Sequence, residues 1–347
     1  MPILECVYID AQSSVIRFIT NDTELGIETI VEGNIIEKGC GAIDARMFFD
    51  IIRKFPNSEV KISFDEKYTA KISCEKSVFT ISGKSGDDFL LLPIIEKGNC
   101  CSLSQFVLKE MIRQTIFSIA ANDNNTNTPV TGELFEINNN TLSTITLDGH
   151  RISIRRMPLA NDYLNIKVII PGKSLSEISK ILSGEVEDTV NLYFTKNHIL
   201  FDFEDTMIVS RLIEGEYFPI EQMLSVGYET KITISRKNFI DSIDRSTLLV
   251  KEGDKRPLIL RIEDEKIHLY LDSTYGSMNE DLDIKKEGKD ILIAFNPRFL
   301  LDALRTIDDD EVDIYFLNTK APCFIRNSEE SYIYVILPIN INQSQYS

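Results

Sequence analysis

The sequence lacks the features that mark several common protein classes. No apolar run approaches the roughly 18 residues that a membrane-spanning helix needs, and residues 1–5 contain no basic segment of the kind that begins a signal peptide. None of the six cysteines is spaced as in C-x-x-C, and Cys100 and Cys101 are adjacent. The cysteine pattern therefore predicts no metal or redox site. It predicts reduced thiols in a cytoplasmic protein with no membrane partner.

Motifs that carry catalysis or bind cofactors are also scarce. Gly-Lys-Ser occurs at 83–85 and 172–174, but Val78 and Lys167 replace the earlier glycine of a phosphate-binding loop. The acidic run at 308–311 is better interpreted as a polar turn than as a metal cluster. Asp148 and His150 would form an acid–base pair in a hydrolase, but the sequence indicates no nucleophile. We therefore expect a non-catalytic protein without a metal or a cofactor.

Basic residues are also fewer than acidic ones. The chain has 54 acidic and 37 basic residues, and its formal net charge is −17. Such a balance ordinarily argues against a polyanionic partner. The length of 347 residues is sufficient for two or three domains.

Against this background, one pattern of charge occurs three times, with a spacing of roughly 125 residues. In each copy a cation is followed four residues later by an anion and three residues after that by a second cation. On a helix these offsets place all three side chains on one face, opposite an apolar face. The three copies are Arg46, Asp50, Arg53; Lys173, Glu177, Lys180; and Arg298, Asp302, Arg305.

The repeat extends beyond these helices. Each is followed by a strand of the pattern Val-x-aliphatic-x-Phe, at 60–64, 190–194 and 312–316, and then by further alternating segments. Two copies also begin with a helix, at 102–120 and 235–249, and a strand led by proline. The first copy begins at that strand, so by comparison roughly 25 residues are absent from it. We predict three α+β domains, at 1–98, 99–228 and 229–347.

Several short segments of the sequence resemble those of a known family. Residues 146–152 read Thr-Leu-Asp-Gly-His-Arg-Ile, and residues 334–338, near the end of the sequence, read Tyr-Val-Ile-Leu-Pro. Together with Gly-Glu-Leu-Phe-Glu at 132–136 and Phe-Asn at 295–296, these segments resemble the bacterial DNA polymerase III beta subunits, the sliding clamps. The resemblance covers nearly the whole chain. It implies three tandem DNA-clamp domains, with helices lining the interior of a ring and antiparallel sheets outside.

The resemblance also implies a function and reconciles the acidic composition with a DNA partner. Two subunits would close head to tail around duplex DNA and tether the replicative polymerase for processive synthesis. Cations on the helices would face the phosphates without reading sequence, while most acidic residues would lie outside. The DNA-facing side chains would be Arg46, Arg53, Lys109, Arg113, Lys173, Lys180, Lys237, Arg298 and Arg305. The dimer interface would contain Phe79, Ile81, Leu248 and Leu249.

A pocket for partner peptides is implied between the second and third domains. Its partners would be the polymerase III alpha subunit, clamp-loader subunits and other proteins carrying a glutamine-led motif with aliphatic and aromatic anchors. Apolar walls with a few polar groups suit such a segment. The residues are Val130, Leu147, Gly149, His150, Arg151, Ile152, Pro219, Met223, Leu224, Asn296, Phe299, Val335, Ile336, Leu337, Pro338 and Ile339.

Several positions depart from the family pattern. The first domain lacks its initial strand and helix, Leu147 stands where threonine is usual, and Phe299 stands where tyrosine is usual. Asn340 replaces a frequent arginine, and a polar tail follows at 342–347. The main alternative is a scaffold of repeated α+β domains that binds proteins but not DNA. Salt-dependent association with DNA separates the two.

Overall fold

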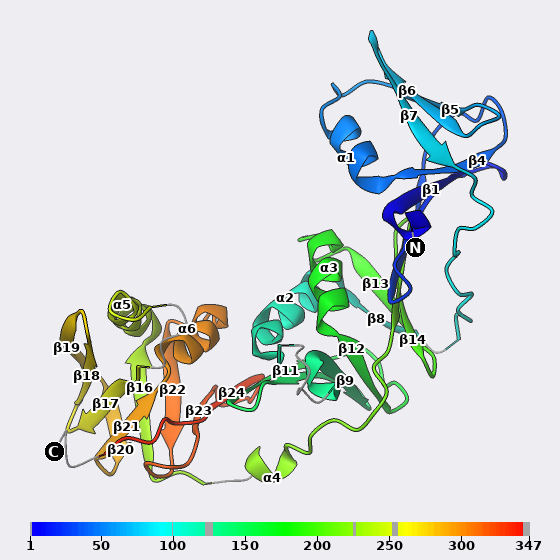
Figure 1. The fold of residues 1–347 in the computed structure, drawn as a ribbon. Helices are drawn as coiled ribbons and strands as arrows, with labels where there is room; N and C mark the ends of the chain where they lie inside the picture. Colours follow the sequence, from blue (N-terminus) through cyan, green and yellow to red (C-terminus); the bar gives the residue numbers. More distant parts are fainter. Residues whose placement is uncertain (1, 99, 122–127, 225–226, 252–255, 343–347) are drawn as a thin grey trace. The chain divides into compact units, whose positions relative to one another are not determined.

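The structure, a computed structural model, describes residues 2–98, 100–121, 128–224, 227–251 and 256–342 (Figure 1). The predicted boundary at Asn99 and the tail residues 343–347 lie outside these ranges. The chain divides into two compact units, one of residues 1–105 and 183–212 and the other of residues 106–182 and 213–347.

The α-helices are short, and five of the six in the described residues lie in segments where the repeat predicts a helix, whereas the helix at Glu221–Leu224 was not predicted. The α-helices are α1 Ala45–Arg53, α2 Gln105–Thr115, α3 Gly172–Ile181, α4 Glu221–Leu224, α5 Arg236–Thr247 and α6 Pro297–Thr306. There are also three 3-10 turns in the described residues: η1 Pro2–Glu5 precedes β1 Cys6–Asp10, η2 Ile116–Ser118 follows α2, and η3 Thr128–Thr131 precedes β9 Gly132–Asn138. Local chemistry sets their starts, since Asp44 accepts a hydrogen bond from the amide of Met47 and Asn296 accepts one from the amide of Arg298.

The first unit is built on one antiparallel sheet of eleven strands. In spatial order these are β5 Val60–Phe64, β6 Thr69–Cys74, β7 Ser77–Lys84, β4 Cys40–Asp44, β1 Cys6–Asp10, β2 Ile16–Asn21, β3 Leu25–Val31, β15 Thr206–Arg211, β14 His198–Phe203, β13 Thr189–Phe194 and β8 Cys100–Ser104. The strands of the first repeat join those of the second through β3 and β15, where Ile27 lies opposite Ile208.

The second unit contains two antiparallel sheets. The larger runs β12 Ile166–Pro171, β9 Gly132–Asn138, β10 Thr141–Leu147, β11 Arg151–Pro158, β24 Tyr332–Ile336, β23 Cys323–Arg326, β22 Glu311–Phe316, β16 Thr230–Ser235 and β20 Lys285–Gly288. The smaller runs β19 Gly276–Asp283, β18 Lys266–Ser273, β17 Leu258–Glu263 and β21 Ile291–Phe295. The second repeat is joined to the third through β11 and β24, so sheets continue from one repeat to the next.

The architecture agrees with the three tandem clamp domains expected from the sequence. In the second repeat β8 and α2 precede the rest, and in the third β16 and α5 do so. Figure 1 shows α5 beside α6 over the strands of the third repeat. The exact domain limits at 98/99 and 228/229 stay a prediction.

One helix prediction needs correction at its start. Residues 102–104 were expected to begin a helix, but they belong to β8, and α2 begins at Gln105. The alternation explains the difference: Cys101 and Leu103 are buried while Ser102 and Ser104 are less so, which is the two-residue period of a strand. Pairing of β8 with β13 satisfies this backbone.

The first repeat differs from the other two at its outer edge. Strands β13 and β22 each pair on both sides, whereas β5 pairs only with β6 within the described residues. As a result Val60 on β5 is half-buried, while its counterparts Val190 and Val312 are buried. On α1, Phe49 is 59% exposed, although its counterpart Leu301 on α6 is 3% exposed. Strand β5 and helix α1 therefore form a more exposed edge than their counterparts in the other two repeats.

Candidate functional site

The predicted DNA-facing cations all lie on helices. Arg46 and Arg53 are on α1, and the others are on α2, α3, α5 and α6. Eight of the nine are exposed, and the ninth, Lys109, is half-buried. Its ammonium group donates to the carbonyl oxygen of Leu182, at the end of α3, over 3.0 Å. The helices therefore carry accessible positive charge at the positions that the repeat predicts.

Acidic neighbours hold several of these cations. Arg113 pairs with Glu110 at 2.6 Å, and this contact raises the pKa of the guanidinium further above its usual value. Lys180 pairs with Glu177 at 2.8 Å, and Arg305 on α6 pairs with Asp244 on α5 at 2.8 Å. These pairs are largely exposed, so each contributes little to stability, and the cation remains available to a phosphate.

The residues predicted for the peptide pocket belong to the second unit. Six of them contribute to one apolar cluster, in which Leu134, Tyr217 and Ile220 are also buried. The six are Val130, Leu147, Ile152, Met223, Leu224 and Val335. Strand pairing places Ile152 opposite Val335 and Arg151 opposite Ile336, so β11 and β24 bring together segments that are far apart in the sequence.

The cluster has a buried base and a more accessible rim. Leu147, Ile152 and Val335 are no more than 8% exposed, whereas Met223 and Leu224 are only partly buried. Ile336 faces the neighbouring core of the third repeat, against which Phe299 packs. The structure does not include Pro219 in either cluster, and its side chain is exposed.

The chain beyond β24 lies alongside the turn at 148–151. The amide of Leu337 donates to the carbonyl oxygen of His150 at 2.9 Å, and the amide of Ile339 donates to that of Ala294 at 2.7 Å. Leu337 is 37% exposed, and Pro338 and Ile339 are half-buried. Asn296 has a structural role, because its side chain caps α6.

The turn at 148–151 is held by Asp148. Its Oδ1 accepts hydrogen bonds from the amides of His150 and Arg151, at 3.0 and 3.1 Å, and its Oδ2 accepts one from Nε of Arg151 at 2.9 Å. Gly149 has φ = +85°, a conformation that glycine adopts without strain. The His150 ring stacks on Phe299, with 5.9 Å between ring centres. Asp148 therefore serves the turn, which weakens the interpretation of Asp148 and His150 as an acid–base pair.

Arg151 takes part in contacts that the sequence analysis missed. Its Nη1 donates to Oδ2 of Asp302 at 2.6 Å, and its Nη2 donates to the carbonyl oxygen of Phe117 at 2.6 Å. The sequence placed Asp302 only on the polar face of a helix, and no local pattern relates it to Arg151. The apolar members Leu134, Tyr217 and Ile220 were missed too, although their alternation or aromatic character was a usable signal.

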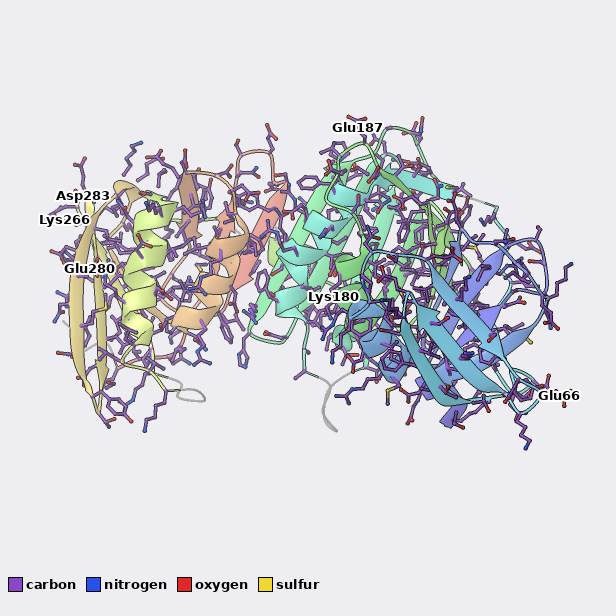
Figure 2. The ribbon with its side chains drawn as sticks, turned by 90° about the horizontal axis from the view of Figure 1, so that it is seen from above. Glu66, Lys180, Glu187, Lys266, Glu280 and Asp283 are labelled. Carbon is purple, nitrogen blue, oxygen red and sulfur yellow. The ribbon has the colours of Figure 1, made fainter. Side chains whose placement is uncertain are left out.

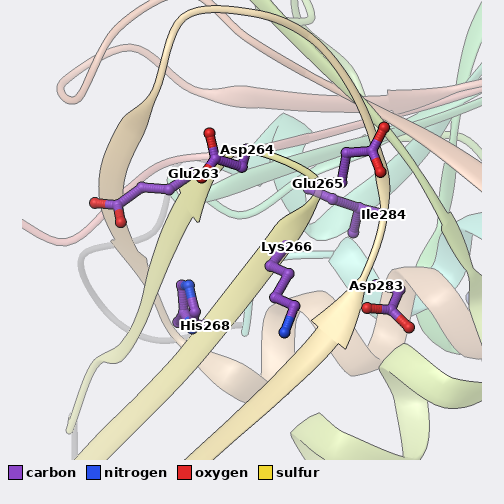
Figure 3. Close-up of a pocket in the computed structure, with 7 residues that line it drawn as sticks. All are labelled: Glu263, Asp264, Glu265, Lys266, His268, Asp283 and Ile284. Carbon is purple, nitrogen blue, oxygen red and sulfur yellow. The ribbon is translucent and has the colours of Figure 1, made fainter.

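A separate hollow of about 390 Å³ lies at the turn between β17 and β18 (Figure 3). Glu263, Asp264 and Glu265 line it together with Lys266 and His268. Figure 2 shows Lys266, Glu280 and Asp283 on the hairpin that β18 and β19 form. The hollow contains none of the residues predicted for the peptide site, and within the described ranges no three His, Cys, Asp or Glu side chains are grouped to hold a metal ion.

The residues predicted for the interface between two copies lie at an edge and at a helix end. Phe79 on β7 is 42% exposed, and Ile81 is half-buried. Leu248, just after α5, is 83% exposed, whereas Leu249 packs against the core. Leu248 is therefore not a core residue of the single chain, whereas Leu249 contributes to the core.

Two further observations concern the chain as a whole. None of the helices in the described ranges combines the length and apolar character that crossing a membrane requires. No disulfide joins the six cysteines, all of which the structure describes.

Comparisons with known proteins agree along nearly the whole chain. Residues 1–93, 102–219 and 221–340 match the models of the N-terminal, central and C-terminal domains of the DNA polymerase III beta subunit. Beta sliding clamps of Staphylococcus aureus and Staphylococcus epidermidis are each 35% identical over 350 residues, covering 98% of this chain and 92% of the relative.

Solved structures give the same result. A crystal structure described as a putative DNA polymerase III beta subunit from Eubacterium rectale is 56% identical, with a TM-score of 0.95 over 99% of this chain and 92% of that one. The DNA polymerase sliding clamp of Bacillus subtilis is 29% identical, with a TM-score of 0.94 over 99% of this chain and 93% of the other. This chain therefore belongs to the family of DNA polymerase III beta subunits, the beta sliding clamps.

Proposed function

We propose that this chain is a processivity subunit: two copies close into a ring around duplex DNA and tether the replicative polymerase during synthesis. Membership of the clamp family supports this assignment. The observation that carries it is the presence of exposed cations at matching positions on the helices of all three repeats. On a chain of net charge −17, such a distribution separates positive charge from the rest of the surface.

The proposed contact with DNA is electrostatic and independent of sequence. Arginine and lysine side chains on short helices reach phosphates and are not inserted into a groove. Acidic partners such as Glu110 and Glu177 compete with the phosphates for these cations. Weak, exchangeable contacts of this kind suit a ring that has to slide, since tight binding would hold it in place.

Ring closure is proposed to join the first repeat of one copy to the third repeat of the other. Residues 77–82 of β7 pair with β6, but β4 pairs only with Lys84 and Gly83 at the end of β7. Strand β19 pairs with β18 alone within the described residues, and α5, which ends beside Leu248, packs on β19. Open strand edges bearing exposed apolar side chains favour association with another strand.

Partner proteins are proposed to insert a short apolar segment at the peptide site. Met223 and Leu224 provide adaptable apolar contacts, and the turn at 148–151 provides polar ones. The polymerase III alpha subunit and clamp-loader subunits are the proposed partners. We propose that the chain works in the cytoplasm without catalysing a reaction of its own.

Primer extension on a long single-stranded template tests this function. The replicative polymerase and clamp loader of the same organism should give much longer products when this chain is added. Products of unchanged length would contradict the proposal. Protein partners without any DNA dependence would instead favour a scaffold that binds only proteins.

A further inference from the structure

The Arg151 side chain is almost completely enclosed by protein. Only 10% of it is exposed, and Nε, Nη1 and Nη2 each donate a hydrogen bond, to Asp148, Asp302 and the carbonyl oxygen of Phe117. Its Cζ atom lies 4.5 Å from the ring centre of Phe299 and 5.2 Å from that of Phe117. A guanidinium group used in this way has little capacity left for an incoming peptide.

Asp302 differs from its counterpart in the second repeat. Glu177 on α3 pairs with Lys180 of the same helix, whereas Asp302 reaches across to Arg151, 151 residues away in the sequence. The neighbouring α6 cation Arg305 pairs with Asp244. The acidic residue at this repeat position therefore pairs within its own helix on α3, but on α6 it pairs with a side chain from another segment.

The contact connects α6 to the turn that presents the polar part of the peptide site. Arg151 bonds Asp302 on one side and Asp148 on the other, and Asp148 fixes the amides of His150 and Arg151. Phe299, one turn before Asp302 on α6, stacks on the His150 ring. Two contacts from the same helix thus help to hold the turn at 148–151, in addition to the bond from the amide of Leu337.

We propose that Asp302 is a positioning residue for the peptide site: it holds Arg151, which holds the turn at 148–151 in the arrangement that accepts a peptide. Helix α6 then serves two functions, since Arg298 and Arg305 are directed to DNA while Asp302 supports peptide binding. The inference rests on the proposed peptide site. It assigns no direct contact between Asp302 and the peptide.

The first test is peptide affinity measured by fluorescence polarisation. The probe is a fluorescein-labelled, glutamine-led peptide with leucine and phenylalanine anchors, and its scrambled form is the blank. Asp302→Asn keeps the shape but removes the charge, and it should weaken binding about fivefold to tenfold, as expected for loss of a charge-assisted hydrogen bond. Asp302→Glu should restore affinity to within about twofold of the parent.

A matched control distinguishes the specific position of Asp302 from the general effect of removing one negative charge. Glu177→Gln removes the equivalent acid of the second repeat and should change peptide affinity less than about twofold. The double variant Arg151→Gln with Asp302→Asn should bind the peptide no more weakly than Arg151→Gln alone. Both changes remove the same contact between Arg151 and Asp302, so the second adds no further loss. Additive losses would show that Asp302 acts by a route other than Arg151 and would overturn the proposal.

The second test requires no peptide. Hydrogen exchange at the amides of His150 and Arg151 should accelerate in Asp302→Asn and not in Glu177→Gln, since both amides are bonded to Asp148. Unchanged exchange together with unchanged peptide affinity would overturn the proposal. If the parent protein failed to bind the peptide, the proposed peptide site would be wrong, and exchange alone would decide the positioning of the turn.

Discussion

The hydroxyl group of Thr115, at the end of α2, donates a 2.5 Å hydrogen bond to Oε1 of Glu133 on β9. Glu133 is fully buried, and its Oε2 has no hydrogen-bond partner among the described residues. Burial raises the pKa of this carboxyl from 4.5 to about 8, and the hydroxyl groups of Thr115 and Thr144, which both lower the pKa, offset only part of that rise. Glu133 is therefore protonated at neutral pH in the folded protein.

This carboxyl predicts a pH dependence of stability. Below about pH 4.5 Glu133 carries a proton in both the folded and the unfolded state. Between that pH and about 8 only the folded state keeps the proton, so the free energy of unfolding falls as pH rises through this window. Glu133→Gln should remove this dependence. Its free energy of unfolding should therefore rise relative to that of the parent by an amount on the order of 5 kcal/mol between low and high pH.

Urea unfolding at about pH 5 and about pH 9 measures the effect. The control is Glu136→Gln, which removes a carboxylate from the same strand at a position that is only partly buried. A constant difference between Glu133→Gln and the parent across this range would show that Glu133 is ionised in the folded state.

Substitutions at the proposed dimer interface should change the mass at which the protein sediments. Leu248→Ala together with Leu249→Ala should produce monomers, because apolar contacts at the end of α5 are lost. Since Leu249 packs on the core, the single change Leu248→Ala separates association from folding and should weaken the dimer without lowering the melting temperature. Sedimentation at micromolar concentration gives the mass, and Leu164→Ala, at another exposed leucine, is the control. A parent protein that sediments as a monomer would contradict the interface.

Removing positive charge from the helices should impair DNA loading more than removing the same charge from other parts of the surface. Arg53, Lys109, Lys173 and Arg298 replaced by alanine should reduce loading onto DNA and shorten replication products, because phosphate contacts are lost. The control replaces four exposed lysines on strands and turns: Lys61, Lys67, Lys266 and Lys320. Equal effects of the two quadruple variants would indicate that net charge matters and that the helix faces do not. Salt titration of binding to a short duplex should give a shallower slope for the helix variant.

Deleting the carboxyl-terminal segment should abolish peptide binding without affecting dimer formation. Deletion of residues 337–347 removes the amides of Leu337 and Ile339 that bond to His150 and Ala294. Peptide affinity, about micromolar in the parent, should be lost, while the sedimenting mass stays that of the dimer. Unchanged affinity after the deletion would place the peptide site elsewhere.

The sequence predicts the repeated parts of this fold well and its long-range polar contacts poorly. Helices α1, α3 and α6 follow from the offset of charges, and the strands that follow them from alternation. Asp302 could not be linked to Arg151, because an ion pair between distant segments leaves no local pattern. The burial of Glu133 could not be predicted from alternation, because β9 is buried on both faces at residues 132–135, where Glu133 contacts Thr115 of α2. The residues of β8 were misassigned because serine and leucine at 102–104 fit both periods.

Retention on circular DNA tests the central claim most directly. The protein is loaded by its clamp loader onto a nicked circular duplex, isolated by gel filtration, and then exposed to a nuclease that makes one double-strand cut. A ring that encircles DNA should remain with the intact circle and dissociate once the circle is linear, with little affinity for the linear duplex at moderate salt. Protein that stays bound to the linear product, or that never remains with the circle, would contradict the account.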